Sequence, residues 1–112
     1  MNRTSRRKVI TGIAMNLTFS MDALRRFCRD RGIRRLSIFG SALREDFGPD
    51  SDIDVLVEFD ADSIPTLLQV ARMERELAQL FGGHPVDLRT QEDLSRYFRA
   101  QVIAEAQVQY AA

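Results

Sequence analysis

Residues 53–59 place two carboxylates inside an otherwise apolar segment, Ile-Asp-Val-Leu-Val-Glu-Phe. In an extended strand, successive side chains point to opposite faces of the sheet. One face would then carry Ile53, Val55, Val57 and Phe59, and the other Asp52, Asp54, Leu56 and Glu58. The segment therefore predicts a strand that buries its apolar face and presents Asp52 and Asp54 together on the other, with their Cα atoms about 7 Å apart.

The rest of the chain predicts helices and strands on either side of this strand. Ser20 is a candidate N-cap for a helix that ends before Gly32, and a short strand over 36–39 ends at Gly40. Ser63 and Pro65 open a second helix, which ends at Gly82-Gly83 and has an apolar stripe of Leu67, Leu68, Ala71, Leu77, Ala78 and Phe81. Residues 85–89 form a third strand, and Thr90 begins a last helix with apolar residues spaced by four, namely Leu94, Phe98, Val102, Ala106 and Tyr110.

This order of elements predicts an α+β fold (mixed α/β), with a small mixed β-sheet and helices packed on one face. The opposite face would stay open and carry Asp52, Asp54 and Asp87. The length of 112 residues fits one domain, which we assign to residues 20–112. Residues 1–19 would be a flexible leader or would precede the true start. Their Ser5-Arg6-Arg7-Lys8 only loosely resembles a twin-arginine export signal, because polar residues interrupt the apolar stretch that follows.

The charged residues are unevenly distributed although the formal net charge is zero. Residues 1–35 contain ten basic side chains, whereas residues 45–62 contain eight acidic ones and no basic one. The acidic block could attract metal ions or a basic partner, and Asp52 and Asp54 lie within it, so steering and chemistry would share one face. The alternative interpretation is two solvated faces. A single cysteine, Cys28, excludes an intrachain disulfide and fits a cytoplasmic protein, and no apolar run approaches the roughly 18 residues of a membrane span.

The clustered carboxylates indicate a site for a hard cation. Asp52 and Asp54 can converge on one ion from the same side, and Asp87 on a neighbouring strand would complete the set. Mg²⁺ takes oxygen ligands and keeps waters or substrate phosphates in its shell. Three carboxylates this close repel one another unless a cation or a proton compensates.

A candidate phosphate-binding segment lies just upstream. Gly40 lets the backbone approach a phosphate closely, the amides that follow can hold its oxygens, and Arg44 can pair with a triphosphate oxygen. We add Ser41 and Ser51 to the nucleotide-binding candidates. Taken alone, Gly40-Ser41 would more often be an ordinary turn at the end of a strand.

The spacing Gly40-Ser41, ten residues, then Asp52-Ile53-Asp54 resembles the signature of the DNA polymerase beta-like nucleotidyltransferase superfamily. The strings Phe-Gly-Ser-Ala-Leu-Arg (39–44) and Ser-Asp-Ile-Asp-Val-Leu-Val (51–57) look most like its minimal branch, the MNT proteins that are paired with HEPN partners in toxin–antitoxin modules. The resemblance covers about residues 21–110. Leu43 departs from relatives, in which a small residue often precedes the arginine.

The resemblance implies a catalytic role for the three aspartates and a reaction. Asp52, Asp54 and Asp87 would bind two Mg²⁺ ions, Asp87 would activate the acceptor hydroxyl, and Gly40-Ser41 would hold the phosphates of ATP. The protein would transfer AMP to a hydroxyl, expected to be a tyrosine, of a HEPN ribonuclease toxin and so act as an antitoxin. It would need no membrane and no direct contact with nucleic acid.

Two alternatives remain open. The chain could neutralise a HEPN partner by covering it, with weak or lost catalysis, although a pure binder does not need clustered carboxylates. It could also modify RNA or a small molecule, which is less favoured because enzymes of that kind normally add a domain to hold the acceptor.

Overall fold

The computed structural model describes residues 17–44 and 47–112. Its elements are α1 (Met21–Asp30), β1 (Ile33–Phe39), the 3-10 helix η2 (Gly40–Leu43), β2 (Ile53–Phe59), α2 (Leu67–Leu80), β3 (Val86–Arg89), the 3-10 helix η3 (Gln91–Asp93), α3 (Arg99–Glu105) and β4 (Gln107–Ala111). The strands form one sheet in the order β3-β2-β1-β4. β1 pairs antiparallel with β2 and β4, and β2 pairs parallel with β3. The predicted mixed sheet is confirmed.

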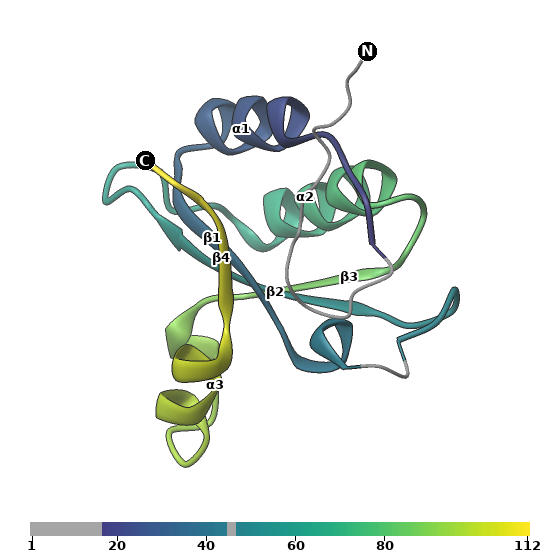
Figure 1. Cartoon of the computed structure of the whole chain (residues 1–112). Coiled ribbons are helices and arrows are strands. Elements are labelled where there is room, and N and C mark those ends of the chain that lie inside the picture. Colours follow the sequence, from purple (N-terminus) through teal and green to yellow (C-terminus); the bar gives the residue numbers. More distant parts are fainter. Residues whose placement is uncertain (1–16, 45–46) are drawn as a thin grey trace.

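Helices α1 and α2 lie together on one side of the sheet, and α3 lies apart from them on the other side in the view of Figure 1. Ser20 caps α1 as predicted, because its hydroxyl accepts a hydrogen bond from the amide of Ala23. The core under α1 and α2 contains Ile53, Val55 and Val57 of β2, which confirms the predicted face of that strand. Cys28 lies in this core, and burial raises the pKa of its thiol to about 12.

Part of the predicted leader belongs to the packed structure. Leu17 is buried in the core, and the ring of Phe19 packs edge-on against Phe81, 4.9 Å between centroids. The packed region therefore extends at least to Leu17. The rest of the predicted leader, residues 1–16, lies outside the described residues.

The prediction of one long last helix is wrong. η3 ends at Asp93, α3 covers only Arg99–Glu105, and Ala106 has an extended backbone that leads into β4. The four-residue spacing suited a helix, but Gln-Val-Gln-Tyr over 107–110 also alternates as a strand does. The strand prevails because β4 supplies hydrogen-bonding partners to β1, which would otherwise be an edge strand.

The second helix also begins later than predicted. Its N-cap is Thr66 rather than Ser63 or Pro65, and Thr66 forms a capping box with Gln69. Leu67 and Leu68, which the sequence analysis placed in the apolar stripe, are 89% and 75% exposed. The buried positions of α2 are Met73 and Leu77. The first turn of α2 is therefore outside the core.

The face opposite the core is less open than predicted. Ser37 and Leu56 are paired neighbours on β1 and β2, and both are buried although neither belongs to the core cluster. η3 lies against β2 on the chain segment that leads to α3. The middle of this face is therefore covered, whereas Asp54 near one end of β2 and Glu58 near the other are both partly exposed. Among the helices of residues 17–44 and 47–112, none has the length and apolar character to cross a bilayer.

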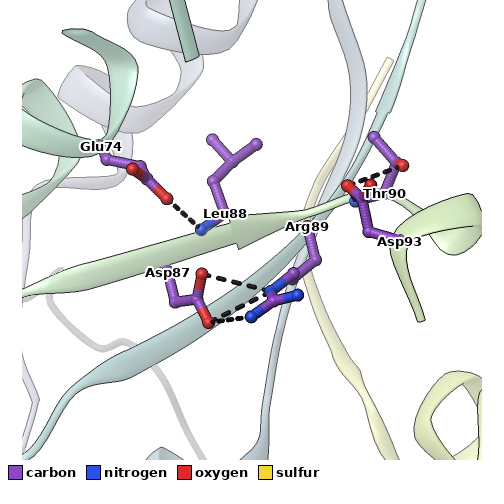
Figure 2. A network of polar contacts seen from close by, with 6 residues as sticks. All are labelled: Glu74, Asp87, Leu88, Arg89, Thr90 and Asp93. Carbon is purple, nitrogen blue, oxygen red and sulfur yellow. Dashed lines mark hydrogen bonds and ion pairs between the residues drawn. The ribbon is translucent and has the colours of Figure 1, made fainter. Parts of the chain in front are cut away.

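Helix α2 also fixes the edge strand β3. The backbone amide of Leu88 donates a 2.8 Å hydrogen bond to Oε2 of Glu74, and Figure 2 shows this contact crossing from α2 to β3. We expect Glu74→Ala to lower the free energy of unfolding by about 1.5–3 kcal/mol, the usual worth of a hydrogen bond to a charged group. Urea denaturation would measure it. Glu74→Gln keeps an acceptor and should recover most of the loss, and equal destabilisation by both variants would contradict this role.

Candidate functional site

The site begins where β1 ends. Gly40 has a backbone φ of 76°, a left-handed conformation that glycine adopts without strain, and it turns the chain into η2. The hydroxyl of Ser41 then donates a 3.2 Å hydrogen bond to the backbone oxygen of Asp52. This contact ties the predicted phosphate-binding segment to the start of β2.

Gly40 lies directly against Asp54. A Cβ built on Gly40 would collide with Oδ2 of Asp54 and would lie 3.2 Å from its Cγ. Phe39, the residue before Gly40, is paired with Asp54 across β1 and β2. A glycine at position 40 is therefore required by both its backbone conformation and the space that the carboxylate occupies.

Asp54 and Asp87 are neighbours in the parallel register of β2 and β3. Paired positions on adjacent strands are about 4.8 Å apart, and side chains in register point to the same face. Burial raises the pKa of Asp54, and the charges of Asp87 and Asp52 raise it further, whereas Arg89 and the Ser41 amide act in the opposite direction. The charges of the three predicted carboxylates thus act on one another. A divalent cation fits such a cluster because it binds oxygen ligands and would neutralise their mutual repulsion.

The carboxylates do not form a preassembled set of ligands. Within residues 17–44 and 47–112, no three acidic, histidine or cysteine side chains are arranged so that they could hold a metal ion. Asp87 is instead engaged by Arg89, whose guanidinium lies 3.0 Å from Oδ2 of Asp87 (Figure 2). A cation at Asp87 would therefore compete with Arg89 for the carboxylate oxygens.

Arg89 is a member of the site that was not predicted from the sequence. The available signal was its spacing: Arg89 follows Asp87 by two residues on a strand, so both side chains point to the same face. Hydrogen bonding to Asp87 and the nearby negative charges raise the pKa of Arg89, so its charge is permanent.

The other two nucleotide-binding candidates lie at the edges of this arrangement. The hydroxyl of Ser51 accepts a 3.0 Å hydrogen bond from the Gly48 amide and so closes the turn before β2. Its backbone oxygen lies 3.0 Å from Nδ1 of His84. Arg44 is exposed and follows η2, next to residues 45–46, which lie outside the described residues. Their roles as phosphate ligands stay predictions.

The acidic block does not form one face, contrary to the sequence analysis. Asp54 lies near the start of β2, and Asp60 follows its end, where the Asp60 amide donates to the Gly32 oxygen. Six residues of strand separate positions by about 20 Å. Asp60 and Asp62 therefore lie at the end of the sheet away from the aspartate cluster.

Comparison with known proteins gives a consistent result. Residues 21–109 match the family described as nucleotidyltransferase domain. The protein adenylyltransferase MntA of Thermococcus cleftensis is 36% identical over 74 residues, which cover 66% of this chain and 72% of that protein. A solved structure of a candidate minimal nucleotidyltransferase is also 36% identical, with a TM-score of 0.62, and covers 77% of this chain and 85% of that one.

A more distant likeness is to a chain in the complex of the tri-AMPylated Shewanella oneidensis HEPN toxin with an MNT antitoxin. The TM-score is 0.55, the identity is 21%, and the match covers 82% of this chain and 70% of the other. At this identity the likeness shows a shared fold.

Proposed function

Because the chain belongs to the nucleotidyltransferase domain family, we propose that it transfers AMP from ATP to a tyrosine hydroxyl of a HEPN-domain toxin and thereby acts as an antitoxin. The observation that carries the proposal is the acidic pair Asp54–Asp87, placed in register beside a glycine turn. A relative that shares 36% identity bears the name protein adenylyltransferase. A structural neighbour contains an AMPylated HEPN toxin.

In the proposed site, Asp52, Asp54 and Asp87 would hold two Mg²⁺ ions, which would supply charge neutralisation of the triphosphate and favour ionisation of the attacking oxygen. The turn at Gly40 and the amides and hydroxyl around Ser41 orient the phosphates beside Asp54. Arg44 and Ser51 would contribute at the edge of the nucleotide site.

Asp87 is the proposed acceptor of the tyrosine proton. The tyrosine oxygen attacks the α-phosphorus of ATP, a new phosphorus–oxygen bond forms, and the bond to pyrophosphate breaks. The products are O-adenylyl-tyrosine, pyrophosphate and the proton. Holding the hydroxyl in line with the α-phosphate accounts for much of the acceleration in this class of reaction.

We expect a purified HEPN protein encoded beside this chain to gain adenylyl groups on tyrosine when it is incubated with the chain, ATP and Mg²⁺. Intact-mass and peptide mass spectrometry would locate the modification. The Asp54→Asn variant is the matched control and should give no modification. A wild-type chain that leaves its partner unmodified while consuming ATP on another acceptor would contradict the assignment of the substrate.

A second function, neutralisation by binding alone, is favoured by one observation. Ile64, Leu67 and Leu68 are three large aliphatic side chains close in sequence that are 72–89% exposed, which is typical of a surface that contacts another protein. The same experiment separates the two functions. An Asp54→Asn variant that still blocks the toxin's ribonuclease activity as well as the wild type would assign neutralisation to binding.

A further inference from the structure

Arg89 contacts both carboxylate oxygens of Asp87, one of the proposed metal ligands. Its Nε lies 3.2 Å from Oδ1 and 3.1 Å from Oδ2 of Asp87, and a terminal nitrogen lies 3.0 Å from Oδ2. Figure 2 shows the guanidinium across both carboxylate oxygens, on the side of β3 away from Glu74. A guanidinium in this geometry binds a carboxylate more specifically than an ammonium can.

This ion pair penalises a bare metal ion in two ways. The ion must compete with Arg89 for the carboxylate oxygens of Asp87. It must also place its positive charge beside a guanidinium that stays charged. A metal ion alone therefore meets a competitor that belongs to the protein.

A metal–nucleotide complex does not meet the same penalty. Its triphosphate carries net negative charge, and phosphate oxygens form bidentate contacts with a guanidinium as carboxylate oxygens do. Arg89 is about half exposed, with 45% of its side-chain surface accessible, so it is free to change partners. Arg89 also lies two register positions beyond Asp87, opposite Leu56 of β2, on the same face as Asp54.

We propose that Arg89 couples metal binding to nucleotide binding. In the metal-free protein it holds Asp87, and when the metal–nucleotide complex enters it exchanges the carboxylate for the triphosphate. Arg89 is thus a positioning residue that makes the carboxylate cluster a weak site for free metal and a stronger one for metal bound to nucleotide. This inference rests on the proposed nucleotidyltransferase site.

The test is a thermodynamic cycle on the full chain. The affinity for Mn²⁺ alone is measured by titration calorimetry, and then the affinity for Mn²⁺ with a non-hydrolysable ATP analogue. Arg89→Gln should bind Mn²⁺ alone more tightly and the Mn²⁺–nucleotide complex more weakly than the wild type. The ratio of the two affinities should fall by roughly 5- to 150-fold, the usual range of coupling between two sites.

Two further variants make the test specific. Arg89→Lys keeps the positive charge but cannot form the bidentate contact, so it should give a ratio of the two affinities between those of the wild type and Arg89→Gln. Arg35→Gln removes another exposed arginine, whose guanidinium lies 3.8 Å from Glu58 on the same face at the other end of β2, and it should change neither affinity. A purely structural role of Arg89 would weaken both affinities together.

The outcomes are distinguishable. If the wild type binds both ligands and Arg89→Gln shifts both affinities in the same direction, or shifts neither, the coupling is wrong and the proposed function stands. If the wild type binds neither Mn²⁺ nor the Mn²⁺–nucleotide complex, the proposed function fails and the coupling fails with it.

Discussion

Replacing Asp54 by asparagine is expected to abolish nucleotidyl transfer and, at the same time, to make the metal-free protein more stable at neutral pH. The activity should fall by at least about 100-fold, since even residues that only orient metal ligands cost about 10–100-fold when removed. The gain in stability follows from electrostatics. Asp54 is a partly buried carboxylate beside Asp87 and Asp52, and an amide of the same shape removes that repulsion.

The gain should depend on pH with a defined sign. Burial and the neighbouring aspartates raise the pKa of Asp54 in the folded protein above the ordinary carboxylate value of about 4. The folded protein therefore holds this proton more tightly than the unfolded chain does. The stabilisation is complete below the ordinary pKa and is lost as the pH rises through the raised pKa. The stability advantage of Asp54→Asn should thus be small near pH 4 and grow toward pH 7.

Glu58→Gln is the matched control for this prediction. Glu58 lies on the same strand and the same face as Asp54, but it forms ion pairs with Arg34 and Arg35. Removing its charge should lower stability slightly, by at most about 1 kcal/mol for exposed pairs, and should leave transfer intact. Thermal unfolding at several pH values, with transfer measured in parallel, would check both variants. Asp54→Asn with normal transfer, or with no gain in stability at pH 7, would contradict the assignment.

The pattern of β2 could be predicted from the sequence because it depends on a local rule. Alternation placed Ile53 in the core and Asp54 on the other face, and the spacing between Gly40 and Asp54 indicated that the two belong to one site. The parallel register that sets Asp54 opposite Asp87 is a tertiary property. From the sequence, the proximity of Asp54 and Asp87 followed only from the expectation that their two strands are neighbours in one sheet.

The errors arose where tertiary contacts decide between two local patterns. Residues 107–110 fit both a helical and an alternating pattern. They form a strand because β1 would otherwise have unpaired backbone groups along this edge, and β4 pairs with them. Leu67 is a large apolar residue on the predicted apolar stripe of the helix, yet it is exposed because the first turn of α2 does not pack against the core. Arg89 was overlooked because an arginine at the end of a strand is usually solvated, and only the structure shows it against Asp87.

Gly40→Ala is expected to impair folding and transfer together, and Gly82→Ala provides a nearly ideal comparison. Both glycines have positive φ angles, 76° and 81°, so alanine should cost about 1–2 kcal/mol of backbone strain at either position. A Cβ at Gly82 would meet no atom within 4 Å, whereas at Gly40 it would collide with the carboxylate of Asp54. The difference between the two variants therefore isolates that collision.

The collision should displace Asp54 from the position that transfer needs. The new Cβ would collide with Oδ2 of Asp54 and lie 3.2 Å from its Cγ, whereas the 3.4 Å contact to Cβ of Asp54 is an ordinary one. Relieving the collision therefore requires the Asp54 carboxylate to rotate away from Gly40. A displacement of about 1 Å at a reacting centre can cost about 100-fold in rate. We therefore expect Gly82→Ala to transfer AMP normally at temperatures where it is folded, and Gly40→Ala to lose about 100-fold at the same fraction folded. Urea denaturation would measure the stability of both variants, and transfer assays would measure their activity.

Adding Asp54→Ala to Gly40→Ala should recover part of the lost stability, since it removes the carboxylate that the new Cβ meets. Equal activity of the two glycine variants, or no recovery in the double variant, would show that Gly40 is required only for its backbone conformation.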